Sequence, residues 1–434
     1  MTNLDLALME LLRRGLRGGE AEDPGLSPEE WLRLLRKADF HKLLPLVLDQ
    51  ALRLPSLRQA AAAERAAASA DSGKQDPASE GRPLAALQNS AVEQACRQAM
   101  QENEFLNLLL ELRAAGLEPL VVKGPVCRAL YPNPLLRPSV DDDLLVPADL
   151  APAFHRFFLA HDLPADDPAA DPETAWELSY HKPNSPLYIE LHVGLFDPDS
   201  EVFRGWNSCF DGAWDRAVPA QIQDVTLKTL CPTDHLLFLI LHAFKHFLHS
   251  GFGLRIISDI ALFAEAHEGE VDFARIRAVC GSLRCLEFTA AVFDIAEKYL
   301  GIPRPAAFSD VSVDEAPLLA DVLEAGIHGQ DVDRLHSANI TLGTVADERQ
   351  GRSAKAKGLR ASVFLPADRL KSRYPFLERR PWLLPVAWTK RVFTYLRDRR
   401  QHSGVHPTAS LRIGRERVAL LEKYHIIHQK KEKD

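Results

Sequence analysis

The chain has 434 residues, of which 46% are apolar and 26% charged, a composition typical of a soluble globular protein with room for two or three domains rather than of a disordered chain. Its first fifteen residues lack the pattern of a signal peptide and no stretch approaches the ~20 apolar residues of a membrane span, so we expect a cytoplasmic protein without a transmembrane segment. The net charge of -8 conceals an acidic body and a basic C-terminal tail.

Helical patterns and a linker make up the N-terminal part of the chain. Residues 1–55 have helical periodicity, and SPEEW at Ser27 combines an N-cap serine with proline at the first helical position. Residues 56–83 are rich in Ala and then in Ser, Gly, Asp and Pro, which predicts a frayed helix followed by a flexible linker. A long helix is expected over residues 84–115, with Gly116 at its C-terminus.

Three strands are expected after that helix. EPLVVKG is rich in β-branched residues and ends at Gly124, and PVCRALY after it can begin a helix. The other two candidates are DDDLLV from Asp141 to Val146 and LYIELHVGL from Leu187 to Leu195. This order of elements predicts an α+β protein with a small mixed β-sheet, flanked by N-terminal and C-terminal helical domains.

The rest of the chain is expected to be helical. The pattern from Thr233 to about Asp347 is that of a helical domain, and prolines break the tail after it into short helices. The expected divisions are a helical segment at 1–55, the linker at 56–83, the α/β core at 84–225, the helical domain at 226–347 and the basic tail at 348–434.

The tail is strongly basic, with 21 Lys and Arg against 7 Asp and Glu from Arg352 to the end. It can bind nucleic acid, an anionic membrane surface or an acidic partner, or it can be a solvated helical face that pairs with the acidic body. Its interleaved aromatic and cationic residues are suited to binding single-stranded nucleic acid or a membrane interface. They are equally suited to a helix that buries its aromatics in the core and turns its arginines outward, and we favour this second interpretation. These residues are Trp382, Trp388, Phe393 and Tyr395, interleaved with Lys390, Arg391, Arg397, Arg399 and Arg400.

Three carboxylates are the candidate metal ligands. Strand alternation places Asp141 and Asp143 on one face and Asp142 on the other. Two ionised carboxylates in one space repel each other, and a hard divalent cation such as Mg²⁺ removes that cost. Catalysis by two metals needs a third carboxylate, and Glu190 lies on the polar face of the third strand. The alternative is a solvated pair of acids at a strand edge.

Lys123 and Gly124 end the first strand just as a helix begins. The free N–H groups and positive dipole end of that helix suit the phosphates of a nucleotide, Gly124 allows close approach, and Lys123 adds a cation. The alternative is a tight turn with a solvated lysine.

The run LVVKGPVCRALYPNPLLRPSVDDDLLV, followed by IELHVGL, resembles the uncharacterised bacterial nucleotidyltransferase family of the DNA polymerase β-like superfamily. LRKADFHKLLPLVLDQAL, LLFLILHAFKHF with LRIISDIALF, and PWLLPVAWTKR extend the resemblance over most of the chain. It implies a nucleotidyltransferase core that uses an NTP, expected to be ATP, with Mg²⁺ or Mn²⁺. The residues it implies are Asp141, Asp143 and Glu190 as metal ligands, with Lys123, Gly124 and Arg137 near the nucleotide.

Two residues depart from the family pattern. Pro125 stands where the superfamily often has a phosphate-binding serine, and it offers neither a hydroxyl nor an N–H. Asp142 replaces an apolar residue, and its burial is costly unless it pairs with an arginine or its face is exposed.

Further polar residues have open roles. Arg137 can bind a phosphate or clamp a carboxylate, and His192 can orient Glu190, contact substrate or be a structural histidine.

A lysine and three histidines share a later helix. Lys245 or a histidine is aimed at the triphosphate or base if that helix packs over the sheet. The alternative is a polar face pairing with Asp259, and Arg255 and Asp259 are themselves an i, i+4 pair. His242, His246 and His249 lack the glutamate of a zincin motif, and none of the six scattered cysteines forms a CxxC pair, so we expect no zinc site.

Two functions from different classes follow from these observations. The first is a metal-dependent nucleotidyltransferase that transfers a nucleoside monophosphate to an unidentified protein, RNA or small-molecule acceptor and releases pyrophosphate. The second, favoured by Pro125 and Asp142, is a catalytically silent nucleotide-binding scaffold that recruits RNA or a protein partner through its tail.

Overall fold

A computed structural model describes residues 1–70, 84–325, 332–349, 370, 374, 376–390 and 409–428. The expected linker begins as a helix, α4 (Pro55–Ala70), and residues 71–83 of it lie outside the described residues. Among the helices that are described, none is long and apolar enough to cross a membrane.

The core of the molecule is one mixed sheet of six strands, in agreement with the predicted α+β class. Its strands are β1 (Leu120–Val122), β2 (Asp142–Leu145), β3 (Glu177–His181), β4 (Tyr188–His192), β5 (Val218–Ile222) and β6 (Val225–Thr229). Their order across the sheet is β3-β4-β2-β1-β6-β5. The pairs β1–β6 and β2–β4 are parallel, and the other three pairs are antiparallel.

Three of these strands, β3, β5 and β6, were not expected from the sequence. In the β5–β6 hairpin Ile222 pairs with Val225, so only Gln223 and Asp224 form the loop. Gln223 has φ +50°, as two-residue hairpin loops of this kind require, but the glycine that usually reveals such a turn is absent.

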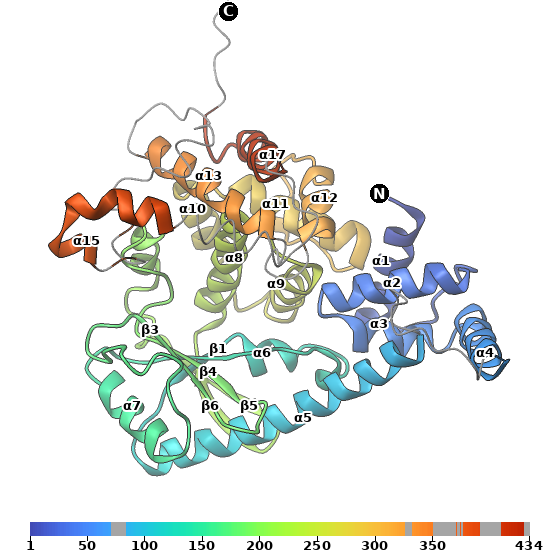
Figure 1. Ribbon diagram of the computed structural model, residues 1–434, viewed down its shortest axis with the longest axis horizontal. Coiled ribbons are helices and arrows are strands. Elements are labelled where there is room, and N and C mark those ends of the chain that lie inside the picture. The colour runs from blue at the N-terminus through green and yellow to red at the C-terminus, as the bar shows by residue number, and fades with distance from the viewer. Residues whose placement is uncertain are drawn as a thin grey trace, which may run out of the picture.

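Helix α5 (Leu84–Ala114) runs from the N-terminal helices along the lower side of the sheet (Figure 1). It carries buried polar residues, and the Gln101 amide donates to Asp142 Oδ2 over 2.9 Å. Arg128, the last residue of the short helix α6 that begins at Gly124, lies 3.3 Å from Asp142 Oδ1 and 3.1 Å from Glu102. Asp142 is therefore paired with an arginine, which was one of the two alternatives.

The other helices form the remaining parts of the molecule (Figure 1). The N-terminal part comprises α1 (Asn3–Arg17), α2 (Pro28–Phe40) and α3 (Leu44–Ala51), and α7 (Ala151–Ala160) lies beside the sheet. The upper part comprises α8 (Pro232–His249), α9 (Leu254–Ala266), α10 (Phe273–Ser282), α11 (Leu286–Ile295), α12 (Ala316–Ala325), α13 (Val332–Arg349) and α17 (Ala409–Lys423). Shorter helical turns are η1 (Pro134–Leu136), η2 (Arg204–Phe210), η3 (Ala296–Leu300), η4 (Ala306–Phe308), α15 (Phe376–Arg379) and η6 (Pro381–Leu383).

One contiguous apolar cluster joins the sheet, the N-terminal helices and the upper helices. The helix start predicted at Ser27 is confirmed, since Ser27 and Glu30 form a reciprocal capping box. The shared core holds α8 and α9 against the sheet and so determines which of their side chains face it.

Part of the basic tail is described. In α17, Arg417 forms an ion pair of 2.8 Å with Asp321, and Lys423 one of 2.6 Å with Asp314. These contacts are those of a helix that pairs with the acidic body. Trp382 is 70% exposed, which differs from the buried aromatics we favoured, whereas Trp388 packs against a small apolar cluster as expected. Residues 391–408 lie outside the described residues.

Candidate active site

The carboxylates predicted from the sequence line a cavity of about 440 Å³ between the sheet and helices α8 and α9. Seven of the eight predicted site residues border it, and the eighth, His192, contacts Asp143. Helix α8 contributes Leu239, His242, Lys245 and His246, and α9 contributes Arg255, Ile256, Asp259 and Ile260. The cavity is thus bounded by residues from two parts of the chain that are distant in sequence.

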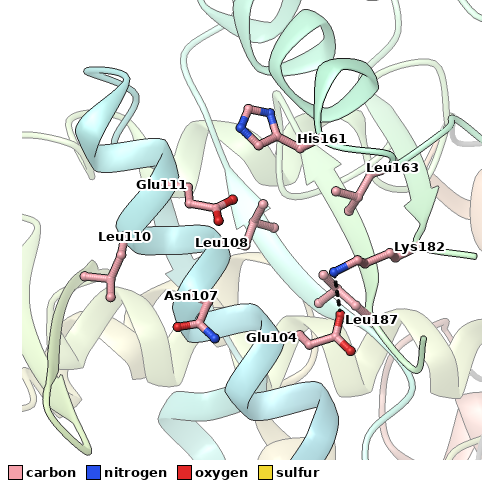
Figure 2. Close-up of a pocket in the computed structure, with 9 residues that line it drawn as sticks. All are labelled: Glu104, Asn107, Leu108, Leu110, Glu111, His161, Leu163, Lys182 and Leu187. Atoms are coloured by element: carbon pink, nitrogen blue, oxygen red, sulfur yellow. Dashed lines mark ion pairs between the residues drawn. The ribbon is translucent and has the colours of Figure 1, made fainter. Parts of the chain in front are cut away.

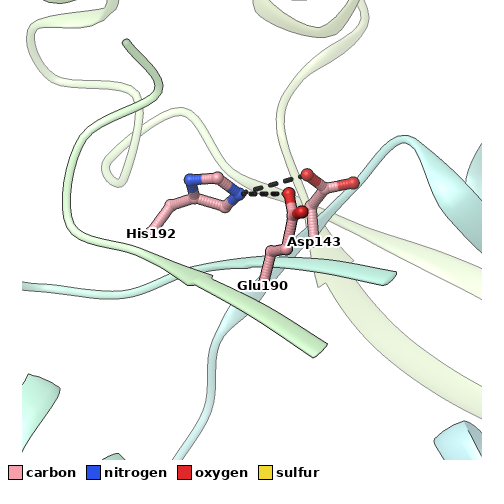
Figure 3. A group of neighbouring side chains, drawn as sticks. All are labelled: Asp143, Glu190 and His192. Carbon is pink, nitrogen blue, oxygen red and sulfur yellow. Dashed lines mark hydrogen bonds and ion pairs between the residues drawn. The ribbon is translucent and has the colours of Figure 1, made fainter. Parts of the chain in front are cut away.

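Asp143 and Glu190 lie side by side because β2 and β4 are parallel and pair these two residues directly. His192 follows two residues after Glu190 and so projects from the same face. Its Nε2 lies 3.1 Å from Asp143 Oδ1 and 3.5 Å from Glu190 Oε2 (Figure 3). One ligand atom from each of the three lies within 4.8 Å of the others, and two carboxylates with an imidazole can bind a divalent cation.

Two cationic side chains stabilise the ionised Asp143. Its burial opposes ionisation, but Lys123, with Nζ at 2.8 Å, and His192 outweigh burial and lower the pKa of Asp143 to about 2. Burial likewise disfavours the His192 imidazolium, and hydrogen bonds to Asp143 and Glu190 raise the pKa of His192 to about 9. A divalent cation at this cluster would take over part of this charge compensation.

Asp141 stands one residue before β2, is half-buried and lines the same cavity. Asp141 does not belong to the group of Asp143, Glu190 and His192, whose ligand atoms lie within 4.8 Å of one another. The structure thus brings Asp143 and Glu190 together with His192, and it places Asp141 in the adjoining wall.

Lys123 occupies a strained turn that a buried histidine supports. The residue has φ +55°, and its backbone N–H donates to His235 Nε2 over 3.1 Å. His235 Nδ1 lies 3.2 Å from Thr229 Oγ1, which itself donates to the Val121 carbonyl. Since Nε2 accepts, the proton of neutral His235 is on Nδ1. Burial disfavours the Lys123 ammonium, but Asp143, Asp141 and Glu190 outweigh it and raise the pKa of Lys123.

Gly124 has a packing role in addition to the predicted close approach of a ligand, which stays a prediction. Gly124 has φ +31°, and a Cβ at this position would lie 2.7 Å from Asp142 Oδ1. The Asp142 carboxylate cannot easily move, because Gln101 and Arg128 hold it. Glycine is therefore needed here for packing against Asp142, although Gly124 also borders the cavity.

We expect Gly124→Ala to lower the free energy of unfolding by about 1–3 kcal/mol, through backbone strain and the clash with Asp142. Urea unfolding measures this. Gly116→Ala is the matched control, because Gly116 has φ +76° but a Cβ there would meet no atom within 4 Å. Equal losses for the two variants would show that the Asp142 contact does not matter.

His235 predicts a loss of stability in acid. Burial, with a smaller effect of His267, lowers the pKa of His235 to about 3, against an ordinary value of 6.5. Below pH 6.5 the unfolded chain therefore binds a proton that the native protein does not, and this histidine costs about 1.4 kcal/mol per pH unit down to about pH 3. Urea unfolding from pH 7 to pH 4 should show a shallower pH dependence for His235→Asn than for the wild type. An unchanged slope for His235→Asn would contradict the prediction.

Arg137 clamps a carboxylate, the second of its two predicted roles. Its Nε and Nη2 donate to the two oxygens of Asp259 on α9, over 2.8 and 2.6 Å. The Tyr131 hydroxyl donates to the same carboxylate over 2.8 Å. Burial opposes the charge on Arg137, but Asp259 outweighs it and raises the pKa of Arg137. Asp259 thus pairs with the loop before β2, and not with the polar face of α8 that was the alternative role for that helix.

Helix α8 faces the acidic cluster, as its predicted packing over the sheet required. Lys245 borders the cavity and lies 5.9 Å from the centre of the Trp176 ring. Burial and then the charge of Lys123 lower the pKa of Lys245. His242 and His246 approach each other with 2.9 Å between their Nε2 atoms, and His249 is exposed.

Three residues of this region were not recognised in the sequence. His235 lies in the first turn of α8 and supports Lys123, Glu177 is the β3 neighbour of His192, and Arg255 lies in the first turn of α9. The i, i+4 spacing of Arg255 and Asp259 was visible, but it suggested a contact within the helix. No local pattern indicated that β3 would pair with β4.

A second hollow of about 350 Å³ lies between α5, the end of α7 and the turn between β3 and β4 (Figure 2). Lys182 and Glu104 form a 3.0 Å ion pair across it. None of the predicted site residues lines this hollow, so the acidic cluster belongs to the larger cavity.

The fold and the cavity define an α+β protein with side chains that could hold a metal ion beside a cationic wall. The chain belongs to the family described as uncharacterised nucleotidyltransferase, whose model matches residues 27–301. A solved structure that it resembles is that of an antigenic nucleotidyltransferase-like protein from Paracoccidioides brasiliensis, with 15% identity, a TM-score of 0.32, and coverage of 49% of this chain and 98% of that one. No protein with a curated description matches.

Proposed function

We propose that this protein transfers a nucleoside monophosphate from an NTP, with ATP as the expected donor, to an acceptor and releases pyrophosphate. The observation that carries the proposal is the direct pairing of Asp143 with Glu190 across parallel strands, in a cavity that Lys123 and Lys245 also line. Family membership supports the same chemistry.

Asp143 and Glu190 are the residues that would hold Mg²⁺ or Mn²⁺, with Asp141 in the adjoining wall. The side chains fit such an ion, since the donor set consists of carboxylate oxygens and one imidazole nitrogen in close proximity. The bound metal would offset negative charge on the phosphates and polarise the phosphorus under attack.

The other side chains of the cavity bind and orient the substrate. Lys123 and Lys245 place two ammonium groups beside the acidic cluster, where they can contact phosphate oxygens. Leu239, Ile256 and Ile260 form apolar parts of the wall and exclude water, which strengthens each charge interaction. The buried pairing of Asp142 with Arg128 removes one of the two features that suggested an inactive protein.

A catalytically silent nucleotide-binding scaffold is the second candidate. Two observations favour it, namely the engagement of Asp143 by both Lys123 and His192, and the missing phosphate-binding serine at Pro125. Calorimetry separates the candidates, because NTP binding that requires Mg²⁺ without any product would support the scaffold.

The decisive experiment incubates the full chain with α-labelled NTPs, Mg²⁺ or Mn²⁺ and cell extract. We expect label to appear on an acceptor, and mass spectrometry of the product then identifies that acceptor. A parallel reaction with γ-labelled NTP should leave the acceptor unlabelled and release labelled pyrophosphate. The proposal is wrong if the Asp141→Asn plus Asp143→Asn protein transfers label as well as the wild type does.

A further inference from the structure

Arg255 is a buried arginine in the wall of the active-site cavity. The second residue of α9, it is 8% exposed, and its Nη1 donates to the Pro138 carbonyl. Its Nε is buried and has no hydrogen-bond partner in the described part of the chain. The same is true of Arg137 Nη1, the one nitrogen of that guanidinium not used on Asp259.

No carboxylate forms an ion pair with Arg255 in the described part of the chain. Asp259 is four residues away on the same helix, but its two oxygens accept from Arg137 and Tyr131. The charges of Asp259 and Asp141 act on Arg255 without such a contact, and burial and the charge of Arg137 outweigh their attraction. Burial, and next the charge of Arg137, lower the pKa of Arg255 without removing its charge at neutral pH. A buried cation without a counter-ion is costly, so the fold retains a charge that an anionic ligand would compensate.

The surroundings of Arg255 add positive potential. Helix α9 begins after Gly253 without a side-chain cap, and Arg255 stands in its first turn, where the positive end of the helix dipole lies. Arg255 and Ile256 from this first turn line the same cavity as Asp143 and Glu190. The cavity therefore has an acidic wall on the sheet and a cationic wall on α9.

We propose that the guanidinium groups of Arg255 and Arg137 bind the β- and γ-phosphates of the NTP, the part that leaves as pyrophosphate. The identity of the ligand as an NTP rests on the proposed function, whereas the need for an anion rests on the buried Arg255 guanidinium, which has no ion-pair partner among the described residues. A polyphosphate can extend from cations held at Asp143 and Glu190 to donors on the opposite wall. Pro125 offers no phosphate contact through a hydroxyl or an N–H, and Arg255 supplies a contact of this kind from the helical domain instead.

Calorimetry on the full chain with Mg²⁺ and without acceptor tests this assignment, with ATP, sodium tripolyphosphate and AMP as probes. We expect Arg255→Met to weaken binding of ATP and tripolyphosphate about 10- to 100-fold, the effect of losing a charge-assisted hydrogen bond, and to change AMP binding by less than about threefold. Arg255→Lys keeps the charge without the guanidinium fork and should give an intermediate loss.

Arg417→Met is the matched control, because Arg417 is also buried but pairs with Asp321 outside the cavity. We expect it to keep wild-type ATP affinity and to lower the melting temperature more than Arg255→Met, since it breaks a buried ion pair. A purely structural role for Arg255 predicts the reverse, with lost stability and unchanged ATP affinity.

Two results would overturn the assignment. One is equal ATP affinity in the wild type and Arg255→Met. The other is an equal loss of AMP and ATP binding, which would mean that Arg255 contacts a single phosphate rather than the polyphosphate tail. Failure of the proposed function has a different signature, namely Arg255-dependent ATP binding with no transfer of label.

Discussion

Asp143→Asn is expected to weaken Mn²⁺ binding and nucleotidyl transfer on the order of 100- to 1,000-fold, a loss comparable to that of one preorganised charge-stabilising group in an active site. The substitution removes the carboxylate that lies beside Glu190, His192 and Lys123. Electron paramagnetic resonance titration with Mn²⁺ measures the affinity independently of any acceptor.

The neighbouring Asp142→Asn is a sharp control. It changes an adjacent aspartate of the same strand, but one that contacts Gln101 and Arg128 on the other face of the sheet. We expect it to reduce stability and to leave Mn²⁺ affinity near that of the wild type. Equal loss of Mn²⁺ binding in the two variants would show that the cluster around Asp143 is not the metal site.

Asp259→Ala is expected to lower the free energy of unfolding by about 3–5 kcal/mol, the usual cost of leaving a buried charge without its partner. The change would remove the carboxylate that pairs with Arg137 and leave the buried guanidinium groups of Arg137 and Arg255 near each other. It would also remove the acceptor of the Tyr131 hydroxyl. Urea unfolding at neutral pH measures the loss.

The control for this variant is Asp310→Ala, which breaks an ion pair with Arg277 but changes a carboxylate that is 68% exposed. We expect little change in stability there, because water and salt screen exposed pairs. High ATP concentration should restore part of the stability of Asp259→Ala if the phosphates bind the two arginines. A loss no larger than that of the control would contradict the inferred charge balance.

Local sequence was sufficient to predict the acidic strand and the face from which each acid projects. The period of two along DDDLLV separates Asp142 from its neighbours, and the alternation in LYIELHVGL places Glu190 on the polar face, with hydrophobic residues opposite. The helix start at Ser27 and the Lys123–Gly124 turn could be predicted for the same reason, since capping and turn preferences depend on a few adjacent residues.

Tertiary structure alone decided which elements meet. The pairing of β4 with β2 in a register that aligns Glu190 with Asp143, and the placement of His235 under Lys123, join residues separated by tens of positions or more. The same holds for Asp259, which became the partner of Arg137 rather than of Arg255. Such contacts arise from burying one common core, and the energy of that packing is shared among distant segments, so no short stretch of sequence encodes it.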